Sequence, residues 1–399
     1  MSELHRRVAS GKSGLPPPGG GGGGVRRPAS GKRSNTPVHW SAYFKSSRKV
    51  ELPSCRFNVY ESDSLEEGKK SEACTLALLH GGGYSGLTWS VLTKEIVSLV
   101  AIRVLAIDLR GHGETETEDD DDLCIETLAK DVAYIMDSLD YSGSFVLAGH
   151  SMGGAVAVHV SPYLTKAVLS GLVVIDVVEG TALEALGSMD SFLRSRPDRF
   201  YSLSYAVDWS VRSGQTRNFQ SACVSMPGQL KDVKSGEPAT LDLVAKGEEE
   251  KKKKNEIRSA PLVAANSIAE EDEENNGESS SEPFQPPPSP PVAEDPGYTW
   301  RIDLSKTSRH WPGWFEGLSS KFLSVPASKM LLLAGVDRLD KDLTVGQMRG
   351  KFQMQILPQA GHAVHEDVPD RVAEVLATFL VRNKLSHALA DFNIAFPAC

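Results

Sequence analysis

A serine between two glycines, where a buried strand pattern changes into a helix pattern, constrains this chain more than any other feature. The apolar run from Ser144 to Gly149 predicts a strand, and the residues from Met152 onward predict a helix. Gly149 and Gly153 flank Ser151 in a Gly-x-Ser-x-Gly pattern. Such glycines let the backbone crowd itself in a tight turn, which leaves the serine Oγ exposed above the sheet. The pattern therefore predicts that Ser151 is a nucleophile at the edge of a sheet.

Short apolar runs alternate with helical patterns along most of the chain, as in a mostly parallel sheet flanked by helices. An apolar stripe from Ile125 to Leu139, at steps of three and four residues, predicts a helix that covers the sheet. Val372 to Leu380 predicts the closing amphipathic helix. The other predicted strands are Thr75–Leu79, which is the first clear one, Val104–Leu109, Gly171–Val178, Met330–Ala334 and Gln353–Leu357. We therefore expect an α/β fold.

Two segments depart from this alternation. Residues 1–37 are rich in Gly, Pro, Ser and Arg, which predicts a disordered basic tail. Residues 181–325 carry polar helical patterns and several tryptophans, which predicts a cap inserted into the core as a lid. Charge runs and a Pro-rich stretch at 231–296 predict a disordered loop inside that cap. The core is then expected at 38–180 and 326–399.

Charge and cysteine content argue against several classes of function. The formal net charge of −9, from 43 Lys and Arg against 52 Asp and Glu, argues against nucleic-acid and anionic-membrane partners. The five scattered cysteines lack C-x-x-C spacing and predict neither a disulfide framework nor a zinc site. No apolar run reaches the ~20 residues that a membrane-spanning helix needs. We expect a protein of the cytoplasm, the nucleus or both.

A nucleophilic serine needs a histidine that takes its proton, and behind a strand–serine–helix elbow that histidine comes last in the chain. His362 fits this order because it follows the predicted strand that ends at Leu357 and precedes the closing helix. His365 is a rival three residues further on. His150 lies within the elbow itself, and His112 comes too early in the chain.

The acid that orients the histidine has two candidates. Asp337 follows the predicted strand that ends at Ala334, which is the commoner arrangement. Asp176 interrupts the otherwise apolar run from Val173 to Val178. A buried carboxylate is costly without a hydrogen-bonding or cationic partner, and an imidazolium would supply one. The residues alone leave both candidates open.

The oxyanion formed during acyl transfer needs backbone N–H groups already in place. One is expected from Met152, which follows the nucleophile, and the others from Gly82 and Gly83 after the strand that ends at Leu79. This chemistry requires no metal and no organic cofactor. The elbow, the helix after it and the order Ser…Asp…His together predict the α/β-hydrolase fold.

At these residues the sequence resembles the protein phosphatase methylesterase family. That resemblance implies that Asp176 is the acid, with Asp337 as the runner-up. The stretches that carry it are Leu79-His80-Gly81-Gly82-Gly83, Gly149 to Ala155, Ile175-Asp176-Val177-Val178-Glu179-Gly180-Thr181-Ala182, Tyr298-Thr299-Trp300-Arg301, Leu331 to Leu343, and Gly361-His362-Ala363-Val364-His365-Glu366.

The resemblance also implies a substrate and a partner. Members of the family remove the methyl ester from the C-terminal leucine of the catalytic subunit of type 2A protein phosphatase, which they hold through its own active-site face. Contact with a regulatory subunit of the holoenzyme is linked to a Leu-x-x-Ile-x-Glu type motif. Here Ile268 and Glu270 remain, but Ala265 replaces the first anchor. The alternatives are a small-molecule carboxylesterase or lipase, and a phosphatase-binding inhibitor on a hydrolase fold.

Overall fold

The computed structural model describes residues 34–52, 54–66, 73–139, 141, 143–243, 297–335 and 339–394. Three earlier expectations fall wholly or mostly outside these residues: the tail at 1–37, the motif that begins at Ala265, and Asp337. Of the expected inner loop, residues 231–243 are described. They turn back on themselves, because the N–H of Ala239 donates to the carbonyl of Leu230.

A nine-stranded, mostly parallel sheet forms the centre of the fold, as the sequence predicts. The strands from β4 to β12 in spatial order are all parallel, whereas β1, β2 and the short β5 pair in antiparallel fashion. In spatial order the strands are β1 (Ser46–Leu52), β2 (Cys55–Asp63), β4 (Arg103–Ile107), β3 (Thr75–Leu79), β6 (Phe145–His150), β7 (Leu169–Ile175), β11 (Ser328–Leu333) and β12 (Gln353–Ile356), with β5 (Glu116–Thr117) beside β2.

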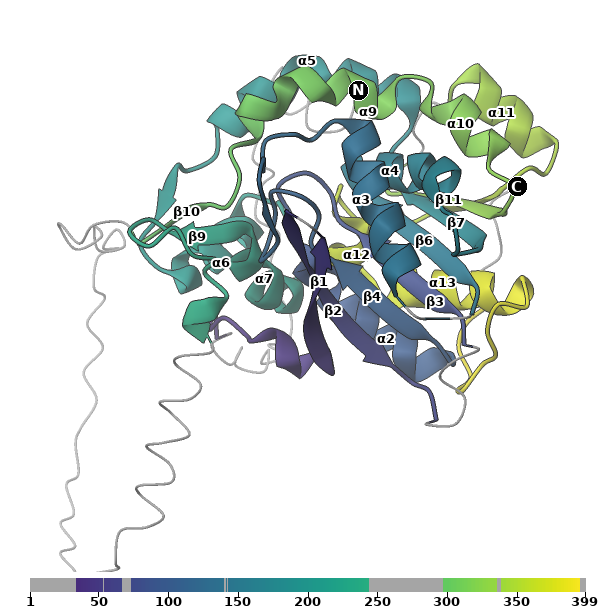
Figure 1. Ribbon diagram of the computed structural model, residues 1–399, viewed down its shortest axis with the longest axis horizontal. Helices are drawn as coiled ribbons and strands as arrows, with labels where there is room; N and C mark the ends of the chain where they lie inside the picture. The colour runs from purple at the N-terminus through teal and green to yellow at the C-terminus, as the bar shows by residue number, and fades with distance from the viewer. Residues whose placement is uncertain are drawn as a thin grey trace, which may run out of the picture. The chain divides into compact units, whose positions relative to one another are not determined.

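Helices cover both faces of the sheet, so alternate residues of each central strand enter different cores. In β3, Ala77 and Leu79 join the core under α3 (Ile125–Ser138) and α4 (Met152–Val160). Leu76 and Leu78 join the core under α2 (Ser90–Leu99) and α13 (Pro369–Arg382). The two helix layers lie on opposite sides of the sheet in Figure 1. Burial on both faces explains why these strands read as continuous apolar runs.

The cap lies between β7 and β11 and has a small core of its own. Its three-stranded antiparallel sheet packs with two helices around Phe200, Trp209 and Trp300, and these elements gather at one side of Figure 1. Trp311 and Trp314 instead join the main core. The elements are α5 (Glu179–Arg194), β8 (Arg199–Phe200), α6 (Leu203–Arg212), α7 (Phe219–Ser225), β9 (Leu230–Asp232), β10 (Tyr298–Trp300), α9 (Trp311–Phe315) and α10 (Leu318–Ser324).

The two antiparallel strands at the start of the sheet, β1 and β2, are not among the strands that the sequence predicts. Most side chains of β1 are exposed, and only Val50 is buried. An edge strand of this kind lacks the continuous apolar run that marks a strand buried on both faces. Among the described helices, none combines the length and the apolar character that crossing a bilayer requires.

Candidate active site

Ser151 occupies a strained position at the turn from β6 into α4. Its φ of 52° lies where residues other than glycine rarely occur. Its N–H donates to the carbonyl of Ile175 at 2.9 Å, which ties the turn to the neighbouring strand β7. Strain of this kind persists only where the surroundings enforce it, and it concentrates at functional sites.

Glycines on both sides of Ser151 make this turn possible. A Cβ at Gly149 would lie 2.1 Å from the carbonyl oxygen of Gly153, and a Cβ at Gly153 would lie 2.3 Å from that of Leu79. Real Cβ atoms do not approach other atoms so closely. The elbow is therefore pressed against the end of β3, the strand that leads into the glycine turn at residues 81–83.

Asp176 and His362 form the next part of the site. The Nδ1 atom of His362 lies 2.8 Å from Oδ2 of Asp176, and Oδ1 accepts the N–H of Ala334 at 2.8 Å. A carboxylate only accepts hydrogen bonds, so Nδ1 carries the proton and Nε2 keeps its lone pair. The side chain of His362 is 57% exposed, whereas that of Asp176 is 9% exposed. The candidate base can therefore be reached from solvent, while the candidate acid is covered.

The structure places Asp176 differently from the strand interior assumed in the sequence analysis. Strand β7 ends at Ile175, and Asp176 follows with a φ of 54°, a conformation that no strand continues. At the carboxyl edge of the sheet the carboxylate meets both His362 and a backbone N–H. The cost expected for a charge in an apolar strand therefore does not arise.

The loop of His362 lies against the elbow. The ring centroids of His150 and His362 are 4.6 Å apart, and Nε2 of His150 donates to the carbonyl of His362 at 2.8 Å. This contact brings the histidine loop against the residue that precedes Ser151. His150 itself is fully buried and takes no place beside Asp176.

The rival histidine belongs to the core. His365 is fully buried, with its ring centroid 3.9 Å from that of Trp89 and its Nε2 2.9 Å from the Thr88 hydroxyl oxygen. Burial lowers the pKa of His365 to about 3, so the ring stays neutral. Its contacts are those of a packed core side chain.

The glycine turn differs in one respect from the expectation that Gly82 and Gly83 both supply oxyanion donors. The N–H of Gly83 donates to Nε2 of His112 at 2.9 Å and is therefore engaged. Nδ1 of His112 donates to the carbonyl of Arg110 at 2.7 Å, which leaves Nε2 as the acceptor. Burial lowers the pKa of His112 to about 4, so this arrangement holds at neutral pH.

Gly82 and Met152 remain available as donors. Within the described part of the chain, their N–H groups make no hydrogen bond to other residues. A Cβ at Gly82 would lie 3.7 Å from Sδ of Met152, so the two residues are neighbours across the site. The geometry thus leaves one donor on the glycine turn and one on the elbow.

Two residues that sequence reasoning missed hold the histidine loop in place. Oδ2 of Asp367 accepts the N–H of Gly361 at 2.6 Å, and Oδ1 accepts the N–H of Arg217 from the cap at 2.6 Å. The Arg217 guanidinium donates in turn to the carbonyl of Gln359 at 2.9 Å. Only the position of Asp367 shortly after His362 could have indicated such a role. These contacts connect the cap directly to the loop of the candidate base.

Known proteins resemble this chain closely. Residues 76–375 match the alpha/beta hydrolase family. The mouse (Mus musculus) protein phosphatase methylesterase 1 is 50% identical over 384 residues, which cover 94% of this chain and 92% of that one. The chain belongs to the protein phosphatase methylesterase family. A more distant member of the family, from Schizosaccharomyces pombe, is 38% identical and covers 78% of this chain and 76% of its own.

Solved structures share the methylesterase fold at much lower identity. E-2-(acetamidomethylene)succinate hydrolase matches with a TM-score of 0.57 at 15% identity, covering 84% of this chain and 99% of its own. The thioesterase domain from the curacin biosynthetic pathway matches with a TM-score of 0.53 at 15% identity, covering 83% and 98%. At such identity these similarities establish the α/β-hydrolase fold alone.

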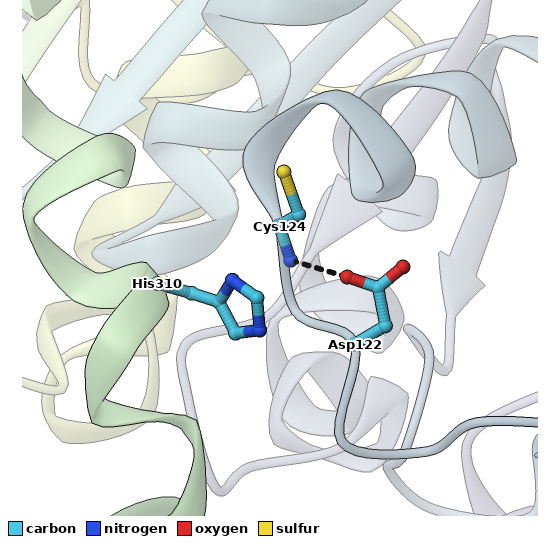
Figure 2. A group of neighbouring side chains, drawn as sticks. All are labelled: Asp122, Cys124 and His310. Atoms are coloured by element: carbon cyan, nitrogen blue, oxygen red, sulfur yellow. Dashed lines mark hydrogen bonds between the residues drawn. The ribbon is translucent and has the colours of Figure 1, made fainter.

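Among its described residues, the methylesterase chain also contains one cluster of three side chains of the kinds that bind metal ions. The ligand atoms of Asp122, Cys124 and His310 lie within 4.8 Å of one another, but the Cys124 sulfur points away from the other two side chains in Figure 2. Each is already engaged, because the Cys124 thiol donates to Glu126 at 2.8 Å, the Asp122 carboxylate accepts the N–H of Cys124, and Nε2 of His310 accepts from Arg309 at 3.0 Å. Burial raises the pKa of the Cys124 thiol, which disfavours the thiolate that a metal needs. This group does not form a prepared metal site.

Proposed function

We propose that this chain removes the methyl ester from the C-terminal leucine of the catalytic subunit of type 2A protein phosphatase. The observation that carries the proposal is the hydrogen bond between Asp176 and His362 beside the Ser151 elbow. It occurs in a chain that shares half its residues with a relative named protein phosphatase methylesterase 1. The chain is accordingly a carboxylic ester hydrolase with a protein substrate.

In the first step Ser151 attacks the ester carbonyl while Nε2 of His362 takes the proton from its Oγ. Asp176 holds the ring with its proton on Nδ1 and stabilises the imidazolium that forms. The N–H groups of Gly82 and Met152 hold the negative oxygen of the tetrahedral intermediate. When the intermediate collapses, the bond to the methoxy group breaks, and His362 protonates the departing methoxy oxygen, which leaves as methanol.

The second step frees the enzyme. His362 takes a proton from a water molecule, whose oxygen attacks the acyl carbon and forms a second tetrahedral intermediate. The bond to Ser151 Oγ then breaks and Oγ regains a proton from His362. The product is a free C-terminal carboxylate. No metal or organic cofactor enters either step.

The proposed partner is the phosphatase catalytic subunit, on its own or in a holoenzyme with a regulatory subunit. Such a substrate agrees with the exposure of His362, because a bulky protein end can approach a base that is open to solvent. We also propose that the chain acts in the cytoplasm, the nucleus or both. A general small-molecule esterase would instead turn over free esters as fast as the methylated phosphatase.

Replacing Ser151 tests the proposal. The purified Ser151→Ala variant should lose demethylation of the methylated phosphatase, followed by mass spectrometry of its C-terminal peptide. Ser188→Ala is a matched control, because the hydroxyl of this exposed serine on α5 donates to the carbonyl of Ala185 within the same helix, and its loss should leave the rate unchanged. Full activity of Ser151→Ala, with a silent control, would exclude Ser151 as the nucleophile.

A further inference from the structure

Arg196 places a positive charge beside the glycine turn without an ion-pair partner among the described residues. Its Nε is buried and makes no hydrogen bond. No ion pair is found for this side chain in the described part of the chain. A Cβ at Gly83 would lie 3.8 Å from Nη1 of Arg196, so the guanidinium borders the turn that carries the proposed oxyanion donor.

The cap holds this guanidinium in a fixed position. Its Cζ lies 4.1 Å from the centre of the Trp300 ring, which is a stacked cation–π arrangement. The indole N–H of Trp300 donates to the carbonyl of Pro197 at 2.7 Å, and the ring packs edge-on against Phe200 and Trp209. Arg196 is therefore fixed by the aromatic core of the cap.

Other arginines of this chain show what a buried guanidinium normally requires. Arg110 forms a two-pronged pair with Asp131 at 2.8 and 3.0 Å, and Arg301 pairs with Asp120 at 2.9 Å. Burial lowers the pKa of Arg196, and electrostatic contributions from Tyr84 and Asp303 offset only part of that effect. A partly desolvated charge without a partner is costly, and the planar fork of arginine suits a carboxylate.

Apolar groups close the other side of the same space. Leu304 lies 3.1 Å from the Cβ position of Gly83 and 3.7 Å from that of Gly82. Met152 covers Gly82 from the elbow. A peptide whose ester carbonyl lies at Gly82 and Met152 would thus have an apolar wall on one side and a single fixed cation on another.

We propose that Arg196 forms a carboxylate-binding subsite for the peptide chain that is demethylated. The carboxylate can come from an acidic side chain near the methylated end or from the C-terminus that hydrolysis creates. The inference rests on the proposed function only in taking a peptide ester as the substrate. Arg196 acts in selection of the substrate and takes no part in the bond-breaking steps.

Three substrates separate these possibilities. The first is a peptide methyl ester with an acidic residue near its end, the second is the same ester with Asn or Gln in place of the acidic residue, and the third is p-nitrophenyl acetate. Arg196→Met keeps an apolar stem on Trp300 and removes the charge. It should raise KM for the acidic ester by about tenfold or more, as the loss of a charge-assisted bond predicts. Turnover of p-nitrophenyl acetate should stay unchanged. Arg196→Lys should restore part of the affinity for the acidic ester.

Binding of product tests the second source of the carboxylate. The Ser151→Ala variant is titrated with peptides that end in a free carboxylate or a carboxamide, with calorimetry as the readout. Adding Arg196→Met should lower the affinity for the peptide with the free carboxylate by about tenfold and leave the affinity for the carboxamide peptide unchanged. Arg194→Met, which removes an exposed charge two residues away, is the matched control.

An effect on the acidic ester alone identifies the side chain as the source, and an effect on product binding alone identifies the C-terminus. Equal losses on all three substrates, or no change in either the three substrates or product binding, would overturn the proposal. Synthetic peptides keep the result separate from the proposed function. If the wild-type protein hydrolyses them but not the methylated phosphatase, the proposed substrate fails and the role of Arg196 can still be measured.

Discussion

The elbow around Ser151 is held by backbone groups in direct contact, whereas the loop around His362 is held by hydrogen bonds from the nearby Asp367 and from side chains far away in the sequence. At the elbow, the backbone at Gly149 and Gly153 packs so closely against the elbow itself and against β3 that no Cβ atom would fit. At the histidine loop, Asp367 receives the N–H of Gly361 and that of Arg217 in the cap. His150 adds a bond to the carbonyl of His362.

This difference suggests that the Ser151 elbow is rigid, whereas the position of the His362 loop depends on contacts with other parts of the chain. The elbow cannot shift without moving β3, β6 and α4, which form the centre of the main core. The histidine loop depends on hydrogen bonds that cost less to break, and one partner lies in the cap. We therefore expect the proposed nucleophile to be rigid and the position of the proposed base to respond to the cap.

Asp176→Asn should give the largest effect, because it reverses the hydrogen bond between residue 176 and His362. The amide that replaces the carboxylate would donate to Nδ1 of His362 and force the proton onto Nε2, so that the base could no longer accept from Ser151. We expect kcat to fall by about 10⁴-fold, with the fold intact. Ester hydrolysis by purified protein is the measurement, and Asp190→Asn on exposed α5 is the control. A fall of less than about tenfold would indicate that another acid, such as Asp337, orients His362.

Gly153→Ala attacks the elbow itself. The added methyl group would lie 2.3 Å from the carbonyl oxygen of Leu79 and 2.5 Å from that of His80. We expect the free energy of unfolding to drop by about 1–3 kcal/mol, as for other overpacked sites, and activity to fall by about 10²-fold. Urea denaturation and ester hydrolysis measure the two effects.

The control is Gly187→Ala on α5, where a Cβ meets nothing within 4 Å. It should stabilise the protein by about 0.5–1 kcal/mol, because alanine favours a helix. Equal stability and activity of the two alanine variants would show that the elbow tolerates movement, which would contradict the inference that it is rigid.

Asp367→Asn weakens the histidine loop without touching the proposed triad. One of the two backbone N–H groups at this carboxylate loses its acceptor, which should cost about 1–2 kcal/mol. Displacement of His362 should then reduce kcat by about tenfold, with thermal stability measured alongside. Asp370→Asn, exposed at the start of α13, is the control. Unchanged kcat would mean that local contacts suffice to hold the loop.

Glu366→Gln should have the smallest effect on activity and a visible effect on the pH dependence of stability. Glu366 is fully buried near Thr88 and Ser225, and burial raises the pKa of its carboxyl to about 8. The folded chain keeps this proton while the unfolded chain releases it above the ordinary value of 4.5. The free energy of unfolding should therefore decrease as the pH rises from about 4.5 to about 8.

Glutamine carries no ionisable proton, so the variant should lose that part of the slope. Urea denaturation of both proteins at a series of pH values measures the difference. Identical slopes for the two proteins would show that Glu366 is already ionised in the folded state at neutral pH.

Local and periodic patterns in the sequence suffice to predict several parts of this protein. Gly-x-Ser-x-Gly between a strand and a helix defines the elbow, because only glycine permits such backbone crowding. Continuous apolar runs identify the strands that are covered on both faces. The order of the chain singles out His362. For Asp176, the residues alone left a choice that the family resemblance decided.

Contacts between residues that are distant in the chain become visible only in the folded protein. The Gly83 amide is occupied by His112, 29 residues away, so Gly82 is left as the available donor on that turn. Asp367 meets Arg217 across 150 residues. Arg196 reaches the glycine turn because the aromatic core of the cap carries it there. A hydrogen bond or a missing partner of this kind leaves no periodic trace in the sequence, since it arises only when separate elements pack together.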